Sequence, residues 1–148
     1  MKKKLSINNI KLKKFKKPLV CLTAYTTPMA EILDKYCDVI LVGDSLGMVL
    51  HGMKSTREVT LEMMIMHGKA VRRGVTKSLL VVDMPIGTYE SNPKIALKNA
   101  KKIIKETRCD AVKVEGGVKV YKTIKYLVNN NIPVMGHVGF TAKCKKKF

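Results

Sequence analysis

A chain of 148 residues with 46% hydrophobic residues can bury the core of one globular domain, which excludes an intrinsically disordered protein. No apolar run approaches the roughly 18 residues of a transmembrane helix, so we expect no membrane association. The net charge of +18 is concentrated at the ends, with eight lysines in residues 1–17 and four in residues 143–147. These clusters lack interleaved aromatic residues, so we do not expect a nucleic-acid partner, although a basic nucleic-acid-binding module remains an alternative.

Residues 1–17 form a basic leader without the continuous apolar segment of a signal peptide, and we expect residues 18–148 to form one domain. We therefore expect a cytoplasmic protein, with an organelle transit peptide as the alternative. The four cysteines form no CxxC pair and no metal-ligand spacing with the histidines. They are interpreted as reduced structural residues, and Cys21, inside an apolar run, as a small buried thiol.

The predicted elements alternate regularly along the chain. Apolar, β-branched runs predict strands at 18–24, 39–42, 79–82, 111–114 and 132–137. Helices are predicted from Thr27-Pro28 to about residue 36, over 61–74, from Asn92-Pro93 onward, and over about 118–128. No hairpin signal such as Asn-Gly occurs between them. The pattern is typical of an α/β protein with a parallel sheet wound by right-handed βαβ units.

Acidic residues follow three of these strands directly. "VILVGD" ends in Asp44, "LLVVD" in Asp83 and "AVKVEGG" contains Glu115. Ligands bind at the carboxyl ends of parallel strands, so the three acids are candidates for one site. Oxygen ligands without nearby His or Cys favour a hard cation, Mg²⁺. Each acid taken alone is better explained as part of a solvated loop or as a helix cap, and only the three together favour a site.

Other polar residues extend this candidate site. Because strand side chains alternate faces, Lys113 and Glu115 point the same way, away from the helices. Lys113 is either half of a structural ion pair or the partner of an anionic substrate. Ser45 offers a hydroxyl beside Asp44, and His137 ends the fifth strand at the same rim. We interpret His51, in a loop, and His67, in a predicted helix, as structural residues.

In these residues and in the motifs around them, the chain resembles the ketopantoate hydroxymethyltransferase family. The resemblance rests on motifs that occur in the family's order across residues 18–141: "LTAYTTPMA", "VGDSLGM", "HGMKSTREVT", "HGKAVRRG", "VVDMP", "VKVEGG" and "VMGHVGFT". The pair "VGDSLGM" and "VKVEGG" is specific, whereas either alone is shared with related Mg²⁺-dependent enzymes acting on 2-oxo acids. Such a lyase or mutase is the alternative within enzymes.

The resemblance implies a (β/α)₈ TIM barrel, of which this chain holds about the first five βα units. It implies transfer of a hydroxymethyl group from 5,10-methylenetetrahydrofolate to 3-methyl-2-oxobutanoate, with Mg²⁺ as cofactor, and a homo-oligomer, a decamer in this family. By motif, the metal-site acids are Asp44, Asp83 and Glu115, and the substrate-binding residues are Asp44, Ser45, Asp83, Lys113 and His137.

Two departures from the family pattern stand out. Thr26 occupies a position where many members carry Asp, and "AKCKKKF" replaces the usual continuation after "GHVGFT". The family's proton-abstracting glutamate lies on a later strand, beyond residue 148, so no catalytic base is assigned. We expect an incomplete barrel that does not catalyse the transfer by itself.

Overall fold

The structure, a computed structural model, describes residues 4–13 and 16–139. Its strands are β1 (Cys21–Thr23), β2 (Val39–Val42), β3 (Leu79–Asp83), β4 (Ala111–Glu115) and β5 (Val134–His137). Its helices are α1 (Ile7–Leu12), α2 (Thr27–Leu33), α3 (Leu46–Val49), α4 (Leu61–Gly74), α5 (Pro93–Thr107) and α6 (Tyr121–Asn129), with short 3-10 turns at η1 (Thr56–Glu58) and η2 (Gly117–Val120).

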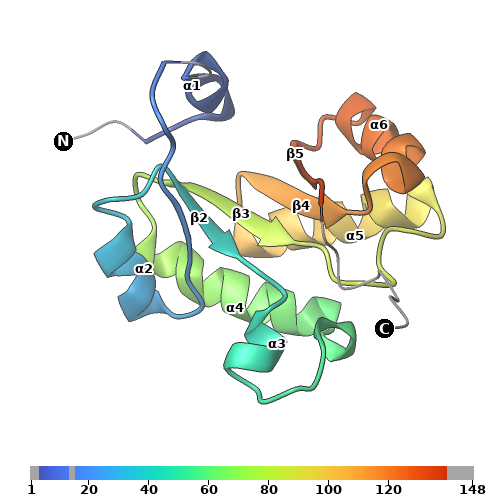
Figure 1. The fold of residues 1–148 in the computed structure, drawn as a ribbon, viewed down its shortest axis with the longest axis horizontal. Helices are drawn as coiled ribbons and strands as arrows, with labels where there is room; N and C mark the ends of the chain where they lie inside the picture. The colour runs from blue at the N-terminus through green and yellow to red at the C-terminus, as the bar shows by residue number, and fades with distance from the viewer. Residues whose placement is uncertain (1–3, 14–15, 140–148) are drawn as a thin grey trace.

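The five strands form one parallel sheet in the order β1-β2-β3-β4-β5, so each strand pairs with its neighbours in sequence (Figure 1). The register pairs Cys21 with Val39, Val39 with Leu79, and Glu115 with His137. This confirms the α/β class and the parallel sheet predicted from the alternating pattern. The first strand is shorter than the predicted 18–24, because only three of its residues join the ladder.

One face of the sheet carries the main core. Ile40, Val42, Leu80, Val82 and Val112 are fully buried there against apolar side chains of α2, α4, α5 and α6. Helix α4 contributes Met64 and Val71, as its predicted apolar face requires, and α5 contributes Ala96, Ala100 and Ile103. Figure 1 shows α2, α4 and α5 along this face and α1 on the opposite side.

The opposite face carries a smaller cluster of Val39, Leu79, Val81 and Ala111. Helix α1, which lies inside the expected leader, packs Ile7 and Ile10 against this cluster. A groove of about 740 Å³ runs between α1, this face and β5. The leader therefore contains a structural element that was not predicted. Its helix starts at a capping box in which Ser6 Oγ accepts from the Asn9 N–H.

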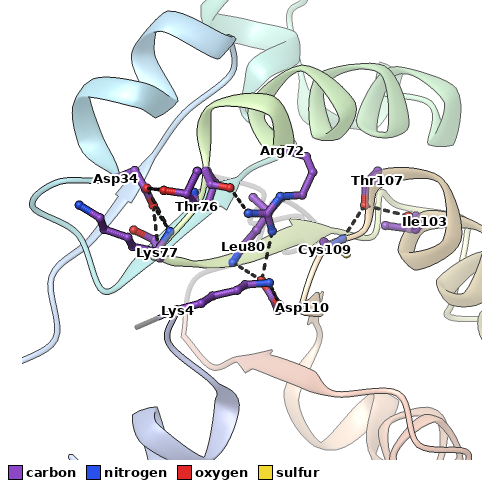
Figure 2. Close-up of polar contacts among 12 residues, drawn as sticks. Lys4, Asp34, Arg72, Thr76, Lys77, Leu80, Ile103, Thr107, Cys109 and Asp110 are labelled. Atoms are coloured by element: carbon purple, nitrogen blue, oxygen red, sulfur yellow. Dashed lines mark hydrogen bonds and ion pairs between the residues drawn. The ribbon is translucent and has the colours of Figure 1, made fainter. Parts of the chain in front are cut away.

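Three aspartates bind the backbone at the amino-terminal edge of the sheet, and Figure 2 shows the contacts of Asp34 and Asp110. Asp34 accepts hydrogen bonds from the N–H groups of Thr76, Lys77 and Ser78, at 2.8–3.1 Å, and from the Thr76 hydroxyl. Asp110 accepts from Leu80 N–H at 2.9 Å and forms ion pairs with Lys4 and Arg72.

Asp38 completes this group. It accepts from the Val20 N–H at 3.1 Å and forms an ion pair with Lys13. Two lysines of the basic leader, Lys4 and Lys13, therefore have internal acidic partners in the folded chain.

Several local predictions need correction. Cys21 was expected to be buried, but it lies on the edge strand and is exposed, whereas Cys37 and Cys109 are buried free thiols. Thr27 begins α2 as predicted, yet its hydroxyl does not cap the helix and instead donates to Ala70 O at 2.8 Å. Asn92 does cap α5, by accepting from Lys94 N–H. In the described residues, no helix combines the length and apolarity that a bilayer span requires.

Candidate active site at the carboxyl end of the sheet

An ionic cluster occupies the carboxyl ends of β3 and β4. Lys113 Nζ lies 3.0 Å from Asp83 Oδ2, 2.9 Å from Asp83 Oδ1 and 3.3 Å from Glu115 Oε1. The three residues are largely buried, and the exposed fractions of their side-chain atoms alone are 12% for Lys113, 6% for Asp83 and 20% for Glu115. One ammonium group thus serves two carboxylates in a site shielded from water.

Side chains along β4 point to alternate faces of the sheet, which explains how the cluster forms. Val112 and Val114 are buried in the main core, so Lys113 and Glu115 project from the other face. Asp83 is the register partner of Lys113 on the neighbouring strand, which brings their side chains together. The prediction that Lys113 and Glu115 point the same way is confirmed.

Asp44 reaches the cluster through its backbone. Its N–H donates to Asp83 Oδ2 at 3.1 Å, in the turn that joins β2 to α3. A Cβ at Gly43 would lie 3.2 Å from Ser45 Oγ, which is a tight contact, and 3.6 Å from Asp83 Oδ2, which is an ordinary one. The Ser45 hydroxyl lies 2.9 Å from the Tyr25 hydroxyl. Ser45 therefore belongs to the same end of the sheet, as predicted from its position.

Tyr89 fixes the end of β4. Its hydroxyl accepts from the Glu115 N–H and donates to the Glu115 carbonyl oxygen, each at 3.0 Å, and the residue is 1% exposed. The chain then turns at Gly116 and Gly117, whose φ angles of 124° and 53° disfavour other residues. Sequence reasoning missed Tyr89, because nothing in the loop after β3 indicates which backbone it contacts.

His137 ends β5 opposite Glu115 in the register. It therefore lies on the rim where it was expected, one strand beyond Lys113. The six predicted residues all come from this one end of the sheet: Asp44, Ser45, Asp83, Lys113, Glu115 and His137.

The electrostatics of the cluster follow from burial. Burial raises the pKa of Asp83, and the attraction of Lys113 only partly offsets that rise. Burial alone would lower the pKa of Lys113, but its two carboxylate partners outweigh this effect and raise it. Lys113 therefore stays protonated at neutral pH. The carboxylate form of Asp83 is less stable here than it would be in water, because burial raises its pKa.

The donor set is compatible with a hard cation. Asp83 Oδ1 is buried and, although 2.9 Å from the ammonium nitrogen, makes no aligned hydrogen bond to any described residue. Within residues 4–13 and 16–139, however, no three His, Cys, Asp or Glu side chains converge closely enough to hold one ion. Mg²⁺ is commonly bound through only one or two carboxylates, water and substrate, so the residues present suit that mode.

Comparisons with known proteins agree on one family. A family profile described as ketopantoate hydroxymethyltransferase matches residues 4–148. Proteins named 3-methyl-2-oxobutanoate hydroxymethyltransferase are 58% identical over 135 residues in Chelativorans sp. (strain BNC1) and 56% identical over 140 residues in Paracoccus denitrificans (strain Pd 1222). These matches cover 91% and 95% of this chain but only 48% and 51% of the relatives, so the chain spans about half their length.

Solved structures share the fold at much lower identity. A 2,3-dimethylmalate lyase, described as a PEP mutase/isocitrate lyase superfamily member, superposes with a TM-score of 0.58 at 13% identity, covering 89% of this chain and 51% of its own. An oxaloacetate acetylhydrolase gives a TM-score of 0.61 at 11% identity, with coverage of 84% and 49%. These likenesses describe the fold alone. The family profile and the close relatives show that the chain belongs to the ketopantoate hydroxymethyltransferase family.

Proposed function

We propose that this chain supplies the 2-oxo-acid and metal anchors of an enzyme that transfers a hydroxymethyl group from 5,10-methylenetetrahydrofolate to 3-methyl-2-oxobutanoate, giving 2-dehydropantoate. The observation that carries the proposal is the buried Lys113 ammonium between Asp83 and Glu115 at the carboxyl end of a parallel sheet. Relatives with the corresponding name, at 56–58% identity, support the same reaction.

Each side chain has a chemical role in this proposal. Lys113 binds the carboxylate of the 2-oxo acid, with Ser45 and His137 as further polar contacts. Asp44, Asp83 and Glu115 are the acids that would hold Mg²⁺, some of them through water. Bound Mg²⁺ supplies Lewis-acid stabilisation of negative charge on the keto oxygen when the C3 proton leaves.

We also propose the architecture and assembly of the whole enzyme. We expect the five strands to be part of an eight-stranded barrel, in a cytoplasmic homo-oligomer. The general base of the family lies on a later strand, so the 148-residue chain should bind the substrate without turning it over. General-base assistance is typically worth about 10²–10⁴-fold, which makes the difference measurable.

The test is calorimetric titration of the 148-residue chain with 3-methyl-2-oxobutanoate in the presence of Mg²⁺. We expect one saturable site, lost in Lys113→Ala and retained in Lys98→Ala, a control that removes an exposed lysine of α5. Equal binding by wild type and Lys113→Ala, with circular dichroism showing both folded, would refute the assigned role. Formation of 2-dehydropantoate by the chain alone would show that the base lies within these residues.

A further inference from the structure

Two histidines far apart in the sequence meet beside α4. His51 follows the C-terminal turn of α3, and His67 lies in the middle of α4. Their Nε2 atoms are 3.0 Å apart, and their rings are nearly perpendicular, at 75°. His51 is exposed and His67 is partly exposed, so the pair is open to solvent.

The other ring nitrogen of His67 has a fixed role. His67 Nδ1 lies 2.9 Å from the backbone oxygen of Tyr25. A carbonyl oxygen only accepts hydrogen bonds, so Nδ1 carries the proton and Nε2 presents a lone pair in the neutral ring. A histidine whose second nitrogen donates to a backbone carbonyl is the usual arrangement of a metal ligand in proteins.

The distance between the two Nε2 atoms suits a shared ion. Two imidazole nitrogens bound to one metal at about 2.0–2.1 Å, in adjacent coordination positions, lie about 2.8–3.4 Å apart. Without a metal, the His51 Nε2–H donates to the His67 lone pair. On binding, His51 moves its proton to Nδ1 by exchange with solvent, so two neutral rings release no net proton.

The backbone holds His51 ready for this role. Its N–H and that of Leu50 both donate to Leu46 O, and Met53 N–H donates to Gly47 O at 2.9 Å. Gly52 supplies the turn with a φ of 66°. Only the exposed ring of His51 must rotate to aim its lone pair at the ion that His67 faces.

We propose that His51 and His67 form a two-histidine site for a borderline transition-metal ion such as Ni²⁺, Cu²⁺ or Zn²⁺. Imidazole favours these ions, whereas Mg²⁺ prefers oxygen ligands. The site does not depend on the proposed transferase activity, because it uses none of the carboxylates at the strand ends. Two protein ligands leave the remaining coordination positions to water or a small anionic ligand.

The test is titration of the folded chain with Ni²⁺, followed by calorimetry and by thermal unfolding. We expect one Ni²⁺ per chain and a rise in Tm. His51→Ala and His67→Ala should each weaken binding at least as much as the ~10–100-fold typical for loss of an outer hydrogen-bond partner of a metal site. His137→Ala, which removes the third histidine of the chain, is the matched control and should bind as wild type.

A spectroscopic measurement separates a two-histidine site from a single exposed imidazole. Pulsed electron paramagnetic resonance of Cu²⁺ bound to the wild type should show two coupled imidazoles, and one in His51→Ala. Because His51 is exposed, its replacement leaves the core intact. Unchanged Ni²⁺ affinity in His51→Ala, one imidazole in the wild type, or loss of binding in His137→Ala would each overturn the proposal.

Discussion

At the two ends of the sheet, the pKa of a buried aspartate is shifted in opposite directions. At the amino-terminal edge, burial alone would raise the pKa of Asp34, but hydrogen bonds from Ser78 and Thr76 outweigh it and lower the pKa to about 2. At the carboxyl end, burial raises the pKa of Asp83, and the one lysine that it shares with Glu115 offsets this rise only in part. Both residues are almost inaccessible, with exposed fractions of 6% and 4%. The number of hydrogen bonds to the charged form therefore separates a structural carboxylate from one left available for chemistry.

Removal of the shared ammonium gives the largest expected effect. Lys113→Ala leaves two carboxylates without their cation, and breaking a buried pair in this way costs about 3–5 kcal/mol of unfolding free energy at neutral pH. Urea unfolding followed by circular dichroism measures it. Lys98→Ala is the control and should stay within about 0.5 kcal/mol.

The same variant tests the raised pKa of Asp83. A carboxyl group whose folded pKa lies above its unfolded value destabilises the fold when charged, and the penalty disappears as the pH falls through the folded pKa. The loss caused by Lys113→Ala should therefore shrink on acidification. If the loss of unfolding free energy in Lys113→Ala stays constant or grows from neutral to acidic pH, the pKa of Asp83 is not raised.

At the amino-terminal edge, we expect Asp34→Ala to lower the free energy of unfolding by about 3 kcal/mol. The substitution leaves the buried Ser78 N–H and its neighbours without an acceptor, and each unsatisfied group costs about 1–3 kcal/mol. Glu31→Ala, an exposed acid on the same helix, is the matched control. Equal unfolding midpoints for the two variants would mean that these hydrogen bonds contribute little.

The pH dependence of Asp34 has the opposite sign to that of Asp83. Its folded pKa of about 2 lies below the ordinary value of 3.8, so its stabilisation is complete above about pH 4 and disappears as the pH falls toward 2. Asp34→Ala should therefore flatten the loss of stability between pH 4 and 2. Acid titrations of wild type and variant, compared by circular dichroism, measure the difference. Parallel curves would show that Asp34 does not titrate in that range.

The smallest expected effect is that of Tyr89→Phe, at about 1–1.5 kcal/mol. The substitution keeps the buried ring but removes the hydroxyl that contacts both backbone groups of Glu115. Amide hydrogen exchange should show faster exchange at Glu115 and no change at Leu80, on the central strand. Unchanged exchange at Glu115 would indicate that water replaces the hydroxyl without consequence.

The central strands and the position of the acids were predictable because both depend on local pattern. Val39–Val42 and Leu79–Asp83 are apolar runs followed by polar residues, and the period of two places Lys113 beside Glu115. The binding roles of Asp44, Ser45, Asp83, Lys113, Glu115 and His137 stay predictions.

The features that sequence reasoning missed depend on long-range contacts. Helix α1 has only six residues, too few for a stable isolated helix, and its helical state is supported by Ile7 and Ile10 packing on a distant sheet. The contact of His51 with His67 spans 16 residues and depends on how α3 meets α4. Neither is encoded in a motif or in a hydrophobic period.

The ion pair between Lys4 and Asp110 joins residues 106 positions apart, whereas each strand pairs with its neighbour in sequence. During synthesis, successive strand–helix units can dock as they leave the ribosome, since each requires only the unit before it. The segment from Lys4 to Lys13, which contains α1 and is made first, has both of its acidic partners only after Asp110 has emerged. We therefore expect α1 to be among the last elements to lock, and nascent chains arrested before residue 110 to leave Lys4 open to proteases.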